Sequence, residues 1–548
     1  MIRERNINIP DSIDISHKST LPPEFGDWLK PSEIGHHQTL YLINTRLWID
    51  QLSKKYDQPI TIDTVPDSEW NDLFGKYDYF WFMGIYTPST ASQEHAKKWC
   101  HEFRYALPDL DPNKDVAASP FAIPEYTPNP KIAKNWEAWD VMVDKLHQHG
   151  KKVMIDFVPN HTALDSKLVR SNPEYFIQGN QDQYNSNLNL FCPVVANDGQ
   201  TYYIAHGKDP NYPEWADTLQ LNYGVPELHE EMAKQLIELS RHSDGVRCDM
   251  AMLLDPSTFI RTWGWILSEK HRDFIQQHSF WQEKIPLVKT DIHQQFDFLG
   301  EIYWDKEYLG QVFDYIYNQD FYKILHESPQ TIKSQIQNLL TAEKNGRHYH
   351  DTLYIENHDE ERASRILGPK LSKAAAVLAG IIPNSIFMVN QGQEMGLKIR
   401  PPMQISRFPD EETDTDTQIF YDKLLHLFRS RLFRQGEWNL ADINSINGDT
   451  IALKVLSPDK KIGAIVCINP YNNYARCTIP EITTQKNVEV VSLTESKNIV
   501  VDMVRSNGIF IGLDPGEVQV VYFSDINSIE VFIPESNRHN LSILFEPN

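Results

Sequence analysis

Three carboxylates in the sequence stand at or just beyond the ends of strand-like runs. Asp249 follows the run GVRC, Glu301 follows the run FLG, and Asp359 lies shortly after the run TLYIE. Cleavage of a glycosidic bond needs one ionised carboxylate at the anomeric carbon and one protonated carboxyl that donates to the leaving oxygen. Burial and neighbouring charge can separate the pKa values of two carboxyls, so that each takes one role. The pattern therefore favours glycoside cleavage.

Other polar side chains occupy similar positions along the chain. Arg247 stands two residues before Asp249, where a guanidinium would keep that carboxylate ionised and oriented. A lone residue of this kind is more often a helix cap or a loop hydrogen-bonder. Only their succession at several strand ends indicates a shared site. The other polar residues in this succession are Asp156, Asn160, His161, Asn357 and His358.

Eight strand-like runs recur along most of the chain, and helical stretches such as 136–149 and 226–240 stand between them. Continuous apolar strands that alternate with helices are typical of a parallel sheet covered by helices. We therefore predict an α/β protein with a closed (β/α)₈ TIM barrel. A doubly wound open sheet is the alternative, which the lack of a GxGxxG after the first run disfavours. The eight runs are 40–43, 79–85, 152–158, 244–249, 298–302, 313–317, 352–356 and 386–389.

Two regions depart from this alternation. More than 60 residues rich in Asn, Asp, Gly and Tyr separate the third run from the helix at Pro226, which predicts an inserted subdomain. Beyond Trp438, short strands follow one another with turns between them, which is typical of an antiparallel β domain. We predict a barrel over 1–158 and 227–436, an inserted domain B over 159–226, and a C-terminal antiparallel β-sandwich over 437–548.

Composition narrows the range of partners. The net charge is −23 and no run is rich in Lys or Arg, which disfavours nucleic acid and acidic membrane surfaces. We find no apolar signal segment and no run of about 20 apolar residues. The five cysteines are widely spaced without a CxxC pair, which indicates reduced thiols. We expect a cytoplasmic protein with a neutral small-molecule or oligosaccharide substrate; the oligomeric state is unknown from sequence.

A metal-dependent hydrolase is the rival enzyme class. It would need paired histidines, as in HxH on one strand or HExxH on a helix. His161 and His358 stand singly in different parts of the chain. The sequence also contains no glycine-rich phosphate-binding loop, so it gives no support for a cofactor enzyme.

Four segments, in order, resemble the conserved regions of the α-amylase family, glycoside hydrolase family 13. They are Asp156–His161, Gly245–Asp249, Gly300-Glu301 and Asn357–Asp359. The resemblance covers the barrel and the long third loop. It implies a retaining α-glycosidase that acts on α-glucosidic bonds of oligosaccharides through a covalent glycosyl-enzyme intermediate. A transglycosylase with a sugar or phosphate acceptor is an alternative, as is an inactive family member that serves as a binding protein.

The resemblance also implies individual roles. Asp249 would be the nucleophile, Glu301 the acid/base, and Asp359 the residue that binds sugar hydroxyls and stabilises the distorted sugar. Arg247 would orient Asp249, and Asp156 would brace Arg247. The implied substrate-binding residues are Phe121, Asp156, His161, Arg247 and His358, with Phe121 in place of the family's stacking tyrosine.

The sequence departs from the family pattern on the acceptor side and at the calcium site. Met252 and Leu253 stand where α-amylases have a Lys-His pair, so we expect no typical endo-acting α-amylase. Asn160 matches a family calcium ligand, but Asn222 and Leu253 do not complete that site. We therefore predict no cofactor, with calcium bound at Asn160 as the alternative.

Overall fold

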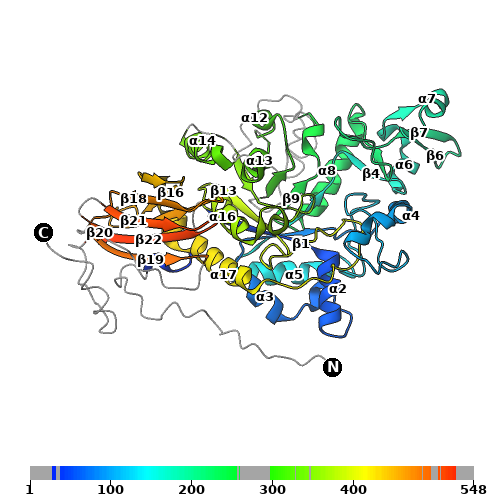
Figure 1. Ribbon diagram of the computed structural model, residues 1–548. Coiled ribbons are helices and arrows are strands. Elements are labelled where there is room, and N and C mark those ends of the chain that lie inside the picture. Colours follow the sequence, from blue (N-terminus) through cyan, green and yellow to red (C-terminus); the bar gives the residue numbers. More distant parts are fainter. Residues whose placement is uncertain are drawn as a thin grey trace. The chain divides into compact units, whose positions relative to one another are not determined.

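The protein is described here by a computed structural model. It covers residues 27–32, 37–255, 258, 296–310, 312–327, 329–344, 347, 349–483, 486–494, 504–505 and 508–525 (Figure 1). The chain divides into two compact units, one of Gly35–Arg429 and one that combines Met1–Ile34 with Ser430–Asn548. Within the described residues, no helix has the length and apolar character needed to span a membrane.

Eight parallel strands of the larger unit close into a barrel. Each strand pairs with its neighbour along the chain, and β1 closes the ring with β13. This confirms the predicted (β/α)₈ barrel and excludes the open sheet. The strands are β1 (His37–Asn44), β2 (Tyr79–Met83), β3 (Lys152–Phe157), β9 (Gly245–Cys248), β10 (Asp297–Gly300), β11 (Tyr315–Tyr317), β12 (His350–Leu353) and β13 (Ser385–Asn390).

The strands form because their residues can be buried on both faces. All five side chains of β2 (YFWFM) and all six of β13 (SIFMVN) are buried. Such uniformly buried strands are what a helix-covered parallel sheet requires. The carboxyl ends of all eight strands therefore meet at one rim of the barrel, where βα-loops carry the functional side chains of this fold.

Helices connect the strands and bury one face each against them. In α5, Asn135 caps the first turn by accepting from the amide of Ala138, and Trp139 and Leu146 are among the buried residues. The predicted helices near 136–149 and 226–240 are confirmed as α5 and α8. The helices are α2 (Thr45–Lys55), α3 (Asp67–Phe74), α4 (Thr90–Lys97), α5 (Trp136–Gln148), α8 (Pro226–Ser240), α12 (Lys306–Leu309), α13 (Gln319–Glu327), α14 (Ile332–Lys344), α15 (Ala363–Ile366), α16 (Gly368–Gly380) and α17 (Thr415–Arg429).

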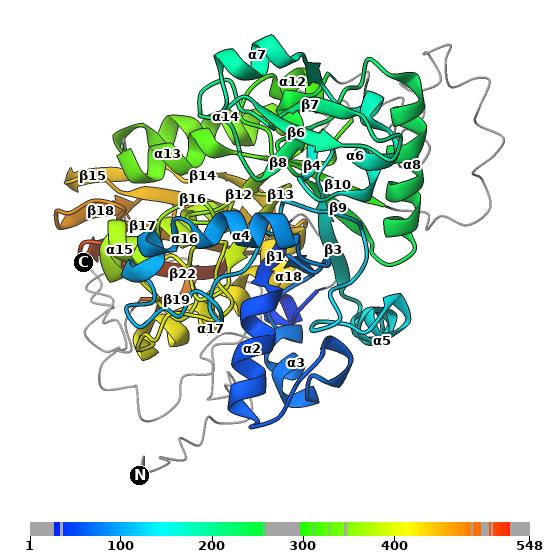
Figure 2. The same ribbon diagram turned by 90° about the vertical axis from the view of Figure 1, so that its right-hand side faces the viewer.

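The long connection after β3 forms small sheets of its own, and Figure 2 shows its elements lying together. β4 (His161–Ala163) pairs with β8 (Thr218–Gln220), so residues far apart in this segment meet. A second sheet has the order β5-β7-β6. Its elements are β5 (Gln178–Gly179), β6 (Phe191–Val195) and β7 (Thr201–Ala205), with helices α6 (Lys167–Ser171) and α7 (Gln181–Ser186) in the same segment.

The second unit contains two antiparallel sheets, in agreement with the predicted β domain. Their orders are β14-β16-β17-β22-β19 and β15-β18-β21-β20. Side chains of both sheets, among them Ile465 and Ile511, share one buried core. The strands are β14 (Glu437–Leu440), β15 (Asn444–Asn447), β16 (Ile451–Leu456), β17 (Ile462–Ile468), β18 (Ala475–Ile479), β19 (Lys486–Ser492), β20 (Val504–Arg505), β21 (Gly508–Leu513) and β22 (Val518–Asp525).

The limits of this unit differ from the predicted boundary at 437. The unit begins at Ser430, which caps the short helix α18 (Arg431–Gln435). It also takes in residues 27–32, since Pro31 forms a β-bridge with Ser430 and the amide of Arg431 donates to the carbonyl of Lys30 at 2.8 Å. Gly436, the last residue of the predicted barrel range, is the C-cap of α18.

Candidate active site

A cavity of about 1270 Å³ lies at the carboxyl ends of the barrel strands. Asp249 and Glu301 reach it directly from the ends of β9 and β10, and Asp359 reaches it from the loop after β12. Phe121 and His161 line it as well. The structure therefore brings five of the predicted site residues to one hollow.

One buried guanidinium connects two of the carboxylates. Nη1 of Arg247 donates to Oδ1 of Asp249 at 2.6 Å. Nη2 of the same side chain lies 2.7 Å from Oε2 of Glu301, in ionic contact but without hydrogen-bond alignment. Arg247 is fully buried, and the rings of Trp81 and Phe121 lie 5.1 and 5.0 Å from its central carbon. Its position in β9 fixes Asp249 and Glu301 on either side of a single positive charge.

Glu301 is held by two hydrogen-bond donors besides this contact. The hydroxyl of Tyr303 donates to Oε1 at 2.7 Å, and the amide of Met250 donates to Oε2 at 2.8 Å. Met250 adopts the left-handed conformation with φ of 46°, which is unfavourable for a residue with a Cβ. The strained turn directs the amide of Met250 at Glu301, so it serves the geometry of the site.

The environments of the carboxyls push their pKa values in different directions. Burial raises the pKa of Glu301; Arg247 opposes this, and the charges of Asp249 and Asp359 add to the rise. Burial also raises the pKa of Asp249, against the charge and the direct hydrogen bond of Arg247. For Asp359, burial alone would raise the pKa, but the charge and hydrogen bond of His358, together with the charges of Arg247 and Arg400, outweigh it and lower the pKa below its usual range. Asp359 is thus the carboxyl most strongly held in its ionised form.

The side chain of Asn357 holds the loop that carries Asp359. Oδ1 of Asn357 accepts from the amides of Asp359 at 2.9 Å and Glu360 at 3.0 Å, which closes a tight turn. Nε2 of His358 lies 3.1 Å from Oδ2 of Asp359, while Nδ1 of His358 is buried without a hydrogen-bond partner among the described residues. The rings of His358 and Phe121 are 5.2 Å apart.

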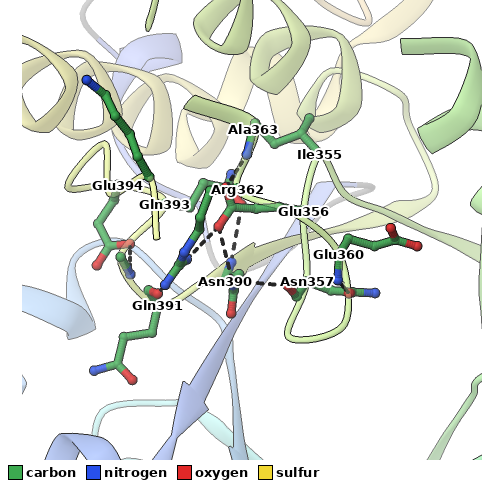
Figure 3. A network of polar contacts seen from close by, with 12 residues as sticks. Ile355, Glu356, Asn357, Glu360, Arg362, Ala363, Asn390, Gln391, Gln393 and Glu394 are labelled. Carbon is green, nitrogen blue, oxygen red and sulfur yellow. Dashed lines mark hydrogen bonds and ion pairs between the residues drawn. The ribbon is translucent and has the colours of Figure 1, made fainter. Parts of the chain in front are cut away.

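A buried polar network closes the base of this loop (Figure 3). Glu356 accepts from Nη1 of Arg362 at 2.6 Å, from Nδ2 of Asn390 at 3.0 Å and from the amide of Ala363 at 2.7 Å. Arg362 also donates to the carbonyl of Gln391 at 2.9 Å. Both charged side chains are almost completely buried. We did not identify this pair in the sequence, although Glu356 and Arg362 flank the motif Asn357–Asp359.

Asp156 lies beneath the cavity with hydrogen-bond partners that were not expected. The family resemblance implied that it braces Arg247. Asp156 lies opposite Arg247 across β3 and β9 and interacts with its charge, while its carboxylate accepts hydrogen bonds from the indole of Trp81 at 3.0 Å and from the amide of Gly84 at 3.2 Å. Burial raises its pKa to about 7, although the charge of Arg247 acts in the opposite direction. Trp81 and Gly84 come from β2 and its end, so this pairing could not be read from the local sequence.

His161 is a neutral group on the cavity wall. Burial lowers its pKa to about 4, so the imidazole is uncharged near neutral pH. Its Nδ1 lies 3.2 Å from Nδ2 of Asn160. A neutral ring of this kind can donate or accept a hydrogen bond with a sugar hydroxyl.

The side chain of Asn160 does not form a metal site with its neighbours. Its Oδ1 accepts from Nε2 of Gln220 at 2.9 Å. In the described part of the chain, no group of three or more His, Cys, Asp or Glu could hold a metal ion. The residues at the family's calcium position therefore do not fit calcium.

The cavity is strongly acidic and has aromatic walls. Lys323 is the one lysine or arginine among the described residues that line it. Several aromatic lining residues were not predicted individually, and Tyr303 and Trp304 could have been found from their position just after Glu301. The lining carboxylates are Glu102, Asp209, Glu214, Asp217, Asp249, Glu301, Asp320, Glu327, Asp359, Glu360 and Glu361, and the lining aromatics include Trp99, Tyr212, Trp215, Tyr303 and Trp304.

The chain is similar in sequence to an α-amylase and an α-glucosidase. It is 24% identical over 304 residues to α-amylase 3 of Dictyoglomus thermophilum, which covers 51% of this chain and 54% of that protein. It is 31% identical over 123 residues to an α-glucosidase of Culex pipiens, 21% of each chain. The chain thus matches about half the length of the first protein and about a fifth of the second.

Solved structures share the fold. A maltogenic α-amylase from Thermotoga neapolitana superposes with a TM-score of 0.61 at 18% identity, covering 89% of this chain and 98% of that one. An α-amylase from Lactobacillus plantarum gives a TM-score of 0.59 at 18% identity, with coverage of 88% and 98%. The catalytic-domain family of α-amylases matches residues 131–423, more than half of the chain. The chain belongs to the family of α-amylase catalytic domains.

Proposed function

We propose that the protein is a retaining α-glycosidase that cleaves α-glucosidic bonds of oligosaccharides by double displacement. One observation carries this proposal: the guanidinium of Arg247 contacts both Asp249 and Glu301 at the wall of a cavity large enough for a sugar. A cation shared by two carboxylates holds both groups at one reacting centre. The family membership of the chain supports the same chemistry.

In the first step, Asp249 attacks the anomeric carbon of the bound glucosyl unit. Its position next to Nη1 of Arg247 favours the ionised, oriented carboxylate that attack requires. Glu301 gives its proton to the glycosidic oxygen as the bond from that oxygen to the anomeric carbon breaks. The raised pKa of Glu301 favours the protonated acid that this transfer needs.

In the second step, the roles reverse. Glu301, now ionised, takes a proton from water, and the water oxygen replaces Asp249 on the anomeric carbon. Asp359, held ionised by His358, binds sugar hydroxyls and stabilises the positive charge that develops on the ring in both steps. The neutral imidazole of His161 and the ring of Phe121 contact the same sugar.

The acidic lining of the cavity affects which molecule can accept the glucosyl group in the second step. Among the described lining residues, carboxylates far outnumber the single lysine, even with Glu301 protonated and Asp320 paired to Lys306, so an anion is repelled and phosphate is a poor acceptor. Water or a neutral sugar meets no such barrier. The aromatic side chains of Trp215, Tyr303 and Trp304 line the same cavity and offer flat faces to a neutral sugar.

Product analysis with maltotriose tests the proposal. We expect hydrolysis to glucose and maltose, with no dependence on added phosphate. Oligomers longer than maltotriose would show transfer to sugar instead, and glucose 1-phosphate would contradict the acceptor argument. No turnover of any α-linked di- or oligosaccharide would overturn the proposed function. Asp320→Asn is the control for substitutions of the catalytic carboxylates and should keep the turnover of maltotriose. Asp320 lines the same cavity but is ion-paired with Lys306 at 2.7 Å.

A further inference from the structure

The two carboxylate oxygens of Glu301 meet chemically different partners. Oε2 faces the amide of Met250 at 2.8 Å and Nη2 of Arg247 at 2.7 Å. Both groups are donors and neither can accept a hydrogen bond. A proton on Oε2 would therefore point at another N–H. This oxygen is suited to carry negative charge in every state of the enzyme.

Among the residues that the structure describes, Oε1 has a single hydrogen-bond partner, and it is of another kind. The hydroxyl of Tyr303 donates to it at 2.7 Å, and a phenolic hydroxyl can accept as well as donate. When Glu301 is ionised, Tyr303 donates to Oε1. When Oε1 carries a proton, the hydroxyl can turn and accept, so no buried donor is left facing a donor.

We propose that Tyr303 is a positioning residue that fixes the transferable proton of Glu301 on Oε1. This inference rests on the proposed function. In the first step the Oε1–H bond breaks, the proton moves to the glycosidic oxygen, and the electron pair stays on Oε1. In the second step Oε1 takes the proton from water. Tyr303 gains and loses no proton: it accepts from Oε1–H before substrate binds, that proton turns to the glycosidic oxygen for the transfer, and the hydroxyl then donates to the ionised Oε1.

Groups other than Tyr303 also influence whether Glu301 is protonated or ionised. Asp249 and Asp359 disfavour the ionised form of Glu301, and Arg247 favours it. His161, Tyr317 and Tyr354 also interact electrostatically with Glu301. These groups remain in place when only the hydroxyl of residue 303 is changed. The contribution of Tyr303 can therefore be isolated by a single-atom change.

The pH profile of kcat/KM with an α-glucoside measures this contribution. Its alkaline limb reports the loss of the proton from Glu301, because the first step needs the protonated acid. A hydrogen bond to a carboxylate is stronger than one to a neutral carboxylic acid. Tyr303 therefore favours the ionised form. We expect Tyr303→Phe to move the alkaline limb upward by about one pH unit and to leave the acidic limb in place.

A matched control and a second variant distinguish the effect of the Tyr303 hydroxyl from a general effect of the substitution. The hydroxyl of Tyr322 donates to Oε2 of Glu360 at 3.1 Å in the same cavity. Tyr322→Phe removes an equivalent hydroxyl and should not move the alkaline limb. If Tyr303→Phe does not fold, 3-fluorotyrosine at position 303 retains the shape but strengthens the donor. The alkaline limb should then move downward, opposite to the shift expected for Phe.

The outcomes separate this inference from the proposed function. Turnover by the unmodified protein that is lost in Glu301→Gln supports the proposed function whatever happens at Tyr303. An alkaline limb that stays in place in Tyr303→Phe, or that moves equally in Tyr322→Phe, overturns the role of Tyr303. A downward shift with Phe, or an upward shift with 3-fluorotyrosine, would overturn it as well.

Discussion

The two ends of the barrel each hold a cluster of partly or fully buried charges, and the clusters differ in charge balance. At the strand starts, Nζ of Lys152 lies 2.9 Å from Asp297 and 2.8 Å from the hydroxyl of Tyr79, which itself donates to Asp297 at 2.6 Å. Lys152 has a direct ion pair with Asp297 alone, and Asp314 acts on Asp297 as a second negative charge. At the strand ends, the single cation Arg247 contacts both Asp249 and Glu301.

The two ends of the barrel differ in role: charged residues at one end contribute to stability, and those at the other end contribute to the reaction. In the cluster at the strand starts, Lys152 forms a direct ion pair with one carboxylate, Asp297, and neither of these side chains nor Tyr79 lines the catalytic cavity. The cluster at the strand ends has more carboxylates than cations and opens to that cavity. Excess like charge in a buried site raises the pKa of a carboxyl and prepares it to hold a proton. We therefore expect substitutions at the strand ends to change rate, and those at the strand starts to change stability.

The largest effect is expected at Asp249. Asp249→Asn removes the attacking oxygen anion while keeping the size of the side chain. We expect kcat to fall by roughly four orders of magnitude with little change in Tm, as measured by initial rates on maltotriose and by thermal unfolding. Activity close to that of the unmodified protein would show that Asp249 is not the nucleophile.

The network beneath the Asp359 loop should give the largest loss of stability. Glu356→Gln leaves the guanidinium of Arg362 buried without a counter-charge, which costs about 3 kcal/mol. Denaturant unfolding measures this cost. Glu361→Gln is the matched control, since its ion pair with Arg365 is at the surface and should be worth less than about 1 kcal/mol. Equal costs for the two changes would contradict the anchoring role of the network.

A smaller loss is expected at the strand starts. Asp297→Asn breaks the pair with Lys152, whose side chain is 34% exposed, so water screens part of the interaction. We expect a loss of about 1–2 kcal/mol in the free energy of unfolding, with kcat nearly unchanged. A fall in kcat comparable to that of Asp249→Asn would remove the contrast between the two ends.

Metal removal should have the smallest effect. Because Oδ1 of Asn160 is already hydrogen-bonded to Gln220, we propose that the protein needs no calcium. Dialysis against EDTA should leave both Tm and the rate on maltotriose unchanged. A loss that added calcium restores would show that ligands beyond those described here complete a site.

The sequence predicts the barrel well because strands such as β2 (YFWFM) are continuous apolar runs between helical stretches. It predicts strand ends less well: the seventh run was placed at 352–356, whereas β12 ends at Leu353, so Asp359 lies in a longer loop. Polar edge strands such as β15 (NSIN), whose residues are all exposed, carry no apolar pattern and were missed.

For the site, sequence reasoning found the carboxylates because their order along the chain is informative. It missed the contacts that come from distant segments. Trp81 binds Asp156 across 75 positions, and Asn390 reaches Glu356 across 34 positions. Such partners are set by the closure of the barrel, which no local pattern encodes. Tyr303 was missed although its position two residues after Glu301 is a usable signal; the contact of its hydroxyl with Oε1 is visible only in the structure.

We expect Asp249 to form a covalent bond with the sugar, and this intermediate can be trapped. The protein would be incubated with 5-fluoro-α-glucosyl fluoride, whose ring fluorine slows release of the glycosyl-enzyme, and then digested for peptide mass spectrometry. We predict one added fluoroglucosyl group, located on Asp249 and absent from Asp249→Asn. An adduct on another residue, or turnover of the reagent to a product of inverted configuration, would contradict the account.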